Sequence, residues 1–145
     1  MEGSDIALGW VKRHEGLRLK PYTCTAGKLT IGYGRNLSDK GISPFEAELL
    51  LRSDLTTASR DASGFVNNFL ALDVTRQAVL IDMAFNLGRS RLATFKKLKA
   101  AIEAEDFAQA AGEMTNSLWA RQVGGRALFL AEVMATGEAI GKITS

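Results

Sequence analysis

The sequence has few of the residues that build covalent or metal-based frameworks. It contains one cysteine, Cys24, and one histidine, His14, among 145 residues. An intramolecular disulfide is therefore excluded, and so are cysteine-based zinc sites and histidine-rich metal sites. A chain of this length buries roughly two thirds of its unfolded surface, so it can fold without such a framework. We expect no metal and no organic cofactor.

A long apolar run is also missing. The longest apolar stretch, near 78–87, is interrupted by Asp82, so no segment reaches the roughly 18 residues of a membrane span. The N-terminus carries Glu2 and Asp5 and has no hydrophobic region of the kind found in signal peptides. We therefore expect no membrane insertion, no signal peptide and no anchor, and accumulation in the cytoplasm where the chain is made.

Charge of one sign gathers in only one segment. The net charge is +2, yet residues 89–99 hold five basic residues and no acidic one: Arg89, Arg91, Lys96, Lys97 and Lys99. This cluster favours a salt-sensitive attraction to an anionic polymer. The chain has no motif, aromatic-interleaved basic strip or module spacing of a nucleic-acid binder, so we expect no nucleic acid as a partner.

The N-terminal part predicts one helix and a small hairpin. Apolar residues at helical spacing predict a helix over 4–14, capped by Ser4 or Asp5. Residues 19–23 and 28–34 read as short strands around a tight turn.

Alternation in the second strand gives Thr30 an orientation. Leu29, Ile31 and Tyr33 alternate with Thr30, so we expect Thr30 to point away from the apolar face. By this pattern alone Thr30 is an ordinary strand threonine.

Everything after residue 43 is predicted to be helical. Ser43, Pro44 and Glu46 form a capping box with proline at the first helical position. A second long helix over 72–87 should be capped by Asp73 and ended by Gly88. We expect its apolar face to consist of Val74, Ala78, Ile81 and Phe85. Shorter helices are predicted over 92–102, 106–115, 117–122 and 126–135.

These elements predict an α+β fold. A small lobe with a helix and a short β-hairpin is joined by the long helix from Ser43 to a larger all-helical lobe. Clefts between lobes commonly hold substrates.

Glu15 is the candidate for chemistry in the small lobe. It lies at the C-terminal end of the first predicted helix, where the helix dipole disfavours a charged carboxylate. A carboxyl group that keeps its proton near neutral pH can act as a general acid, as a glycosidase requires. The alternative is a surface glutamate paired with Arg13 or Arg18.

The stretch from His14 to Arg35 resembles the catalytic segment of the phage-type lysozymes, the endolysin muramidases of glycoside hydrolase family 24. Segments 72–88 and 117–127 resemble the same family in the same order. The resemblance covers nearly the whole chain. It implies a single lysozyme-like domain over 1–145, with lobes roughly 12–60 and 1–11 with 61–145.

The resemblance implies hydrolysis of the β-1,4 bond between N-acetylmuramic acid and N-acetylglucosamine in peptidoglycan. Glu15 matches the general acid, and Thr30 matches a threonine that places the attacking water. The cleft-lining, substrate-binding positions are matched by Phe85, Asn86 and Arg126. Arg126 matches an arginine that faces the catalytic glutamate, which would favour the carboxylate and oppose the dipole argument.

Cys24 departs from the family, whose usual residue there is aspartate. A thiolate, favoured by Lys20, Lys28 or Arg35, could activate a water or stabilise the transition state. It could instead attack the anomeric carbon, which would change inversion to retention. We favour the first role because Thr30 implies a positioned water. The other alternative is a buried inert thiol.

Two neighbouring positions are expected to matter less. Arg35 stands where many relatives have a histidine that pairs with an acidic residue, so it should affect stability rather than activity. His14 precedes Glu15 by one residue, and its side chain therefore points about 100° away around the helix.

Two rival functions remain open. One is a peptidoglycan-binding or virion-associated protein of the same fold that has lost turnover, as the missing aspartate would allow. The other is a thiol hydrolase using Cys24 and His14, which lacks the helix N-terminus and adjacent base that activate a cysteine nucleophile. If the muramidase prediction holds, the protein is expected to be a monomer that reaches the thin Gram-negative peptidoglycan through a separate holin pore.

Overall fold

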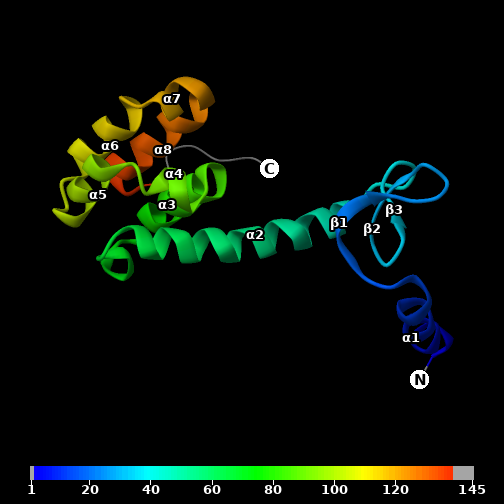
Figure 1. Cartoon of the computed structure of the whole chain (residues 1–145). Helices are drawn as coiled ribbons and strands as arrows, with labels where there is room; N and C mark the ends of the chain where they lie inside the picture. The colour runs from blue at the N-terminus through cyan, green and yellow to red at the C-terminus, as the bar shows by residue number, and fades with distance from the viewer. Residues whose placement is uncertain (1, 139–145) are drawn as a thin grey trace. The chain divides into compact units, whose positions relative to one another are not determined.

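The computed structural model describes residues 2–138, and they form two compact units that divide between Leu49 and Leu50. The first unit holds one helix, a small antiparallel sheet and the start of a long helix, and the second unit is helical (Figure 1). The predicted α+β fold is confirmed. The prediction that residues 1–11 pack with 61–145 stays a prediction.

Helix α1 (Gly3–Glu15) opens the chain. Its N-cap is Glu2, whose backbone N–H donates to the Asp5 carboxylate at 3.1 Å. The predicted caps Ser4 and Asp5 are therefore wrong, because the helix begins at Gly3. Asp5 is the third residue of the helix, and its carboxylate accepts from the backbone N–H of the N-cap. The helix ends at Gly16, whose φ of 73° suits glycine.

The sheet contains three antiparallel strands in the order β1-β2-β3, namely Arg18–Thr23, Leu29–Gly32 and Arg35–Asn36. Tyr22 pairs with Thr30 across the predicted hairpin. The third strand was not predicted. A turn after Gly32 reverses the chain, so β2 ends there and is shorter than the predicted strand over 28–34. Gly32 and Gly34 allow that turn with φ values of 71° and 81°.

Burial in β2 is the reverse of the expectation. Thr30 is 4% exposed and is the only buried polar residue in the described part of the chain, whereas Leu29 is 45% exposed. Burial is tolerated because the Thr30 hydroxyl donates to the Lys28 carbonyl at 2.9 Å. Strand β2 lies between β1 and β3. Packing around the sheet decides which face of β2 is buried, and the alternation of apolar and polar residues along the strand does not.

Helix α2 (Pro44–Phe65) confirms the predicted capping box. The backbone N–H of Ser43 donates to the Glu46 carboxylate at 2.9 Å, and the backbone N–H of Glu46 donates to the Ser43 hydroxyl at 3.1 Å. Its buried residues all lie in its second half: Ala58, Ala62 and Phe65.

The helices that follow are η1 (Phe69–Ala71), α3 (Val74–Leu87), α4 (Arg89–Leu92), α5 (Lys96–Glu103), α6 (Phe107–Thr115), α7 (Leu118–Val123) and α8 (Gly125–Thr136). Asp73, Asp106 and Ser117 cap their helices by accepting a backbone N–H. The single helix predicted over 92–102 is wrong. The chain turns at Ala93–Phe95, where the Thr94 hydroxyl donates to the Arg91 carbonyl at 2.6 Å.

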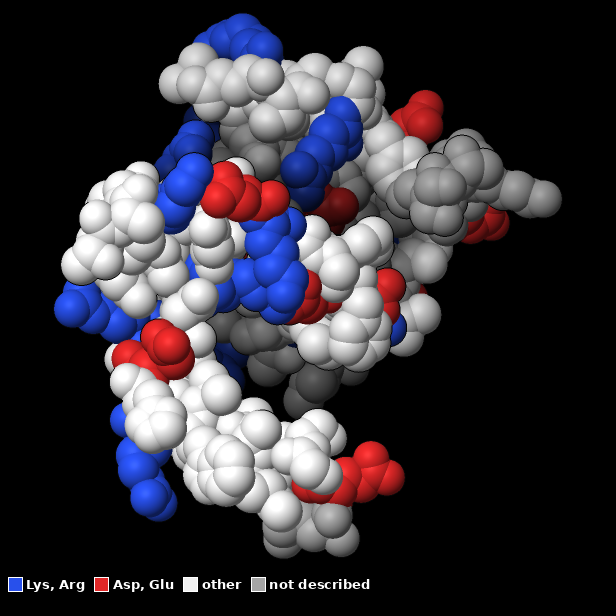
Figure 2. Space-filling view, turned by 90° about the vertical axis from the view of Figure 1, so that its right-hand side faces the viewer, with Lys and Arg blue, Asp and Glu red and all other residues white. Residues whose placement is uncertain are grey.

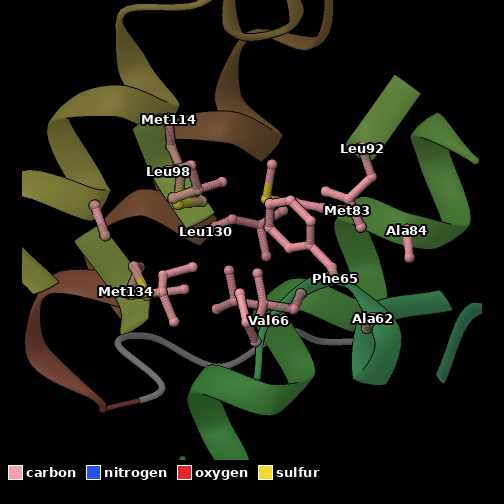
Figure 3. Packing of buried hydrophobic residues seen from close by; sticks show 14 of the residues in the cluster. Ala62, Phe65, Val66, Met83, Ala84, Leu92, Leu98, Met114, Leu130 and Met134 are labelled. Carbon is pink, nitrogen blue, oxygen red and sulfur yellow. The ribbon is translucent and has the colours of Figure 1, made fainter. Parts of the chain in front are cut away.

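The hydrophobic core lies in the second unit. Every buried apolar residue of the described part lies at or after Ala58, and side chains from α2, α3, α5, α6 and α8 meet around Met83, Leu98 and Met134 (Figure 3). The predicted apolar face of α3 is wrong. Val79, Leu80, Met83 and their neighbours are buried, whereas Val74 is 78% exposed and Phe85 is 41% exposed.

Candidate active site

Glu15 lies at the last turn of α1, with its carboxyl group against the backbone of Gly34. A Cβ atom built on Gly34 would stand only 2.9 Å from the Glu15 Oε2 atom. Within residues 2–138, Glu15 forms no ion pair, and Arg18 lies over the ring of Tyr22 at 4.4 Å. The alternative of a glutamate paired with Arg13 or Arg18 is therefore not what the structure shows.

Cys24 stands in the turn between β1 and β2 and is half-buried. Its backbone N–H donates to the Lys28 carbonyl at 2.9 Å, which closes the turn. Hydrogen bonds from the backbone N–H of Lys28, and then from that of Ala26, lower the pKa of the Cys24 thiol, burial raises it, and the nearby Thr30 side chain has a smaller lowering effect. The structure thus brings Cys24 and Thr30 together and favours the thiolate.

Two of the three cations expected to favour that thiolate, Lys28 and Arg35, have acidic partners of their own. Lys28 forms an ion pair with Asp39 at 3.2 Å. Arg35 donates to the Glu46 carboxylate at 2.9 Å, and this bond lowers the pKa of Glu46 to about 2. Arg35 therefore has an acidic partner, Glu46. Figure 2 shows basic and acidic side chains intermixed on the face that it draws.

Phe85 and Arg126 lie in the helical unit and share one groove. The groove measures about 400 Å³ and is also lined by Leu51, Leu55, Ala78, Ile81 and Asp82. Arg126 donates from Nε to the Asp82 carboxylate at 2.7 Å, and its Nη2 lies 2.5 Å from the same oxygen. Arg126 thus has an acidic partner within its own unit that the sequence analysis did not anticipate.

Asn86 connects two helices. Its side-chain oxygen accepts a hydrogen bond from the indole N–H of Trp119 at 2.8 Å, so α3 is tied to α7. Trp119 is only 2% exposed, and its polar atom has to be paired when it is buried. The exposed Asn86 amide group therefore has its oxygen committed to the fold, and its amide nitrogen is left to contact a ligand.

No helix within residues 2–138 is long and apolar enough to cross a membrane. The same residues bring no three histidine, cysteine, aspartate or glutamate side chains together in a way that could hold a metal ion.

Comparison with known proteins decides the family. The model of the family described as "Phage lysozyme" matches residues 12–131. The chain belongs to the phage lysozyme family. It is 32% identical over 119 residues to an endolysin of Acyrthosiphon pisum secondary endosymbiont phage 1, which covers 78% of this chain and 77% of that relative.

Two further relatives come from different sources. The "Probable T4-type lysozyme 2" of Dictyostelium discoideum is 31% identical over 159 residues, covering 88% of this chain and 92% of the relative. The "Pre-baseplate central spike protein Gp5" of Enterobacteria phage T4 is 29% identical over 155 residues, covering 88% of this chain and 27% of that protein. The range matched by the phage lysozyme family contains all six predicted site residues: Glu15, Cys24, Thr30, Phe85, Asn86 and Arg126.

The structure adds three residues that the sequence analysis missed. Gly34 contacts Glu15, Asp82 pairs with Arg126, and Trp119 donates to Asn86. Gly34 follows Gly32 by two residues, and closely spaced glycines often mark a tight turn, so the sequence contained a hint of its role. No local pattern predicts the other two contacts, because they join residues more than thirty positions apart.

Proposed function

We propose that this phage-type lysozyme hydrolyses the β-1,4 bond between N-acetylmuramic acid and N-acetylglucosamine in bacterial peptidoglycan. The observation that carries the proposal is the Glu15 carboxyl group, which has no ion-pair partner in the described residues and lies against the Gly34 backbone. A general acid must keep its oxygen available for the leaving group.

Glu15 in its protonated form would donate to the glycosidic oxygen as the bond to the anomeric carbon breaks. A water on the opposite face would attack that carbon and lose a proton, which leaves one new reducing end and one new hydroxyl group. We assign Thr30 to hold this water and Cys24, as a thiolate, to activate it. The lowered pKa of the Cys24 thiol, to which the nearby Thr30 side chain contributes, supports this division of roles. Inversion at the anomeric carbon is then expected.

We assign Phe85, Asn86 and Arg126 to substrate binding. Phe85 is 41% exposed in a groove, so its ring is available to pack against a sugar face. The Asn86 amide nitrogen and the Arg126 guanidinium group offer hydrogen-bond donors for hydroxyl, amide or carboxylate oxygens.

The test is product analysis on purified Gram-negative peptidoglycan. We expect the wild type to release new N-acetylmuramic acid reducing ends and Glu15→Gln to lose at least about a hundredfold in rate, the lower contribution typical of a general acid. Glu132→Gln makes the same chemical change at an exposed glutamate of α8 and should keep the wild-type rate. The rate of Cys24→Ser then measures what the thiol contributes.

The rival function gives a different result. A folded wild type that binds peptidoglycan and releases no reducing ends would be a binding or virion-associated protein of this fold, and the proposal would fail. The T4 spike protein named above shows that a related sequence occurs within a much longer chain.

Three consequences of the lytic proposal can be measured separately. We propose that the protein acts as a monomer, that it collects in the bacterial cytoplasm, and that it depends on a separate holin for access to the wall. Light scattering tests the first, and fractionation tests the second. Expression with and without a holin tests the third, since lysis without one would contradict it.

A further inference from the structure

Two hollows of the helical unit adjoin each other beside Phe85, the residue assigned above to sugar binding. One measures about 360 Å³ and is lined by both Phe85 and Asp61. The other measures about 410 Å³ and is lined by Asp61, Arg60 and Arg89. Because Asp61 lines both hollows, we treat them as one feature and call it the α2–α4 groove. Each hollow is within the size range of ligand sites in proteins.

One face of α2 and the passage from α3 into α4 form the walls of this groove. On α2 the lining residues recur every three or four positions and therefore share one face of the helix: Asp54, Ala58, Asp61 and Phe65. The floor contains the small residues Ala58 and Ala84, which are 3% and 2% exposed, and their size leaves the groove hollow. Over residues 54–65 a helix rises about 1.5 Å per residue, so the groove runs for roughly 16 Å, longer than one sugar ring.

The polar side chains of the groove have no partners within the part of the protein that the structure describes. Five of them line it and form neither an ion pair nor a side-chain hydrogen bond there: Asp54, Thr57, Arg60, Asp61 and Arg89. Asp61 shares a hollow with two guanidinium groups and pairs with neither of them. Arg126, in contrast, lies in the neighbouring groove and is paired with Asp82. The α2–α4 groove thus presents hydrogen-bond acceptors and donors that are held apart and are available to a ligand.

We infer that the α2–α4 groove binds the glycan strand beyond the sugar that packs against Phe85. This inference rests on the proposed function and adds binding residues to it. Sugar hydroxyl groups donate to the carboxylates of Asp54 and Asp61, and N-acetyl carbonyl oxygens accept from the guanidinium groups of Arg60 and Arg89. The apolar floor suits the C–H faces of the sugar rings. A polyphosphate matches less well, because two carboxylates line the groove and would repel it.

The first arm of the test varies the length of the substrate. Peptide-free glycan chains of increasing length are cleaved by the wild type, by Asp61→Ala and by Arg89→Gln. On the shortest chain that is cleaved, the KM of each variant should equal that of the wild type. On the longest chain it should be about fivefold higher with little change in kcat, because each variant loses one partly exposed hydrogen bond of uniform binding.

Two control variants make similar changes outside the groove. Glu132→Ala removes an exposed carboxylate of α8, and Arg121→Gln removes an exposed guanidinium group of α7. Neither residue lines the α2–α4 groove, so both controls should match the wild type at every chain length. Asp61 and Arg89 are neither buried nor paired, so their variants should also unfold in urea close to the wild type.

The opposite charges of the two groove residues separate specific binding from general electrostatic attraction. Asp61→Ala makes the protein more positive, whereas Arg89→Gln makes it more negative. If the surface only attracted an anionic polymer, Asp61→Ala would strengthen binding and Arg89→Gln would weaken it. We expect both variants to weaken the binding of long chains, since each removes a hydrogen bond to the sugar. Effects of opposite sign, or an equal rise of KM at all lengths, would overturn the inference.

The second arm measures binding without turnover and separates this inference from the proposed function. Long peptide-free glycan chains are titrated by calorimetry into Glu15→Gln, with and without Asp61→Ala, and the added change should weaken binding about fivefold. Such a loss, together with a wild type that releases no reducing ends, would refute the muramidase and leave the groove assignment standing. Reducing ends released with the same KM by the wild type and both groove variants at every length would refute the groove and leave the muramidase.

Discussion

Gly34→Ala should displace the Glu15 carboxylate and lower the rate of hydrolysis. The added Cβ would stand 2.9 Å from Glu15 Oε2 and 3.3 Å from its Cδ atom, closer than such atoms approach. The carboxylate is the free end of a flexible side chain, so it moves aside at little cost in stability. A displacement of the order of 1 Å at a reacting group can lower a rate about a hundredfold.

Gly32→Ala provides the matched control in the same turn. Its φ of 71° resembles the 81° of Gly34, so an alanine at either position adopts a left-handed conformation at a cost of roughly 1–2 kcal/mol. A Cβ on Gly32, however, meets no atom within 4 Å. The two variants should therefore unfold at similar urea concentrations, whereas only Gly34→Ala should lose activity.

The assay compares kcat for release of reducing ends with the midpoint of urea unfolding for both variants. We expect kcat of Gly34→Ala to be about a hundredfold below that of Gly32→Ala at similar stability. Equal kcat values in the two variants would show that the position of Glu15 against Gly34 does not matter, and the role assigned to Glu15 would lose its main support.

Three further predictions concern single side chains. The lowered pKa of the Cys24 thiol means that iodoacetamide should alkylate it with a pH midpoint below that of a free cysteine peptide measured alongside, and a higher midpoint would contradict the hydrogen bonds described here. Glu46 has a pKa of about 2 in the folded protein against an ordinary 4.5, so its stabilising contribution is present above pH 4.5 and is lost as the pH falls toward 2. The stability difference between wild type and Glu46→Gln in urea should shrink over that interval, and a constant difference would be inconsistent with the Arg35 pair. Asn86→Ala leaves the buried Trp119 N–H unpaired and should cost about 1–3 kcal/mol, whereas Asn86→Asp keeps an acceptor and should cost less.

Local signals predicted the helix ends well. Asp73 and Ser43 act as caps because a short polar side chain reaches a backbone N–H only three residues ahead, a contact that needs no tertiary structure. Gly16 and Gly88 end helices for a similarly local reason, since each adopts a positive φ. These local signals were enough to predict most of the helices and their order along the chain.

Contacts between distant segments could not be predicted in the same way. The short strand Arg35–Asn36 has too few residues for a periodic pattern and exists only because β2 offers it an edge. The site residues stay predictions, and their neighbours depend on tertiary structure. The cations near Cys24 in sequence were expected to favour its thiolate, whereas the structure uses backbone N–H groups of the turn.

The wrong face predicted for α3 has a physical cause that bears on function. This helix has two apolar stripes, and periodicity alone cannot tell which one packs against the core. Val79, Leu80 and Met83 are buried, while Ala78, Ile81 and Phe85 line the groove that also contains the Asp82–Arg126 pair. Ile81 also packs against the core, so of this stripe Ala78 and Phe85 are left to face the groove, in line with the substrate-binding role proposed for Phe85.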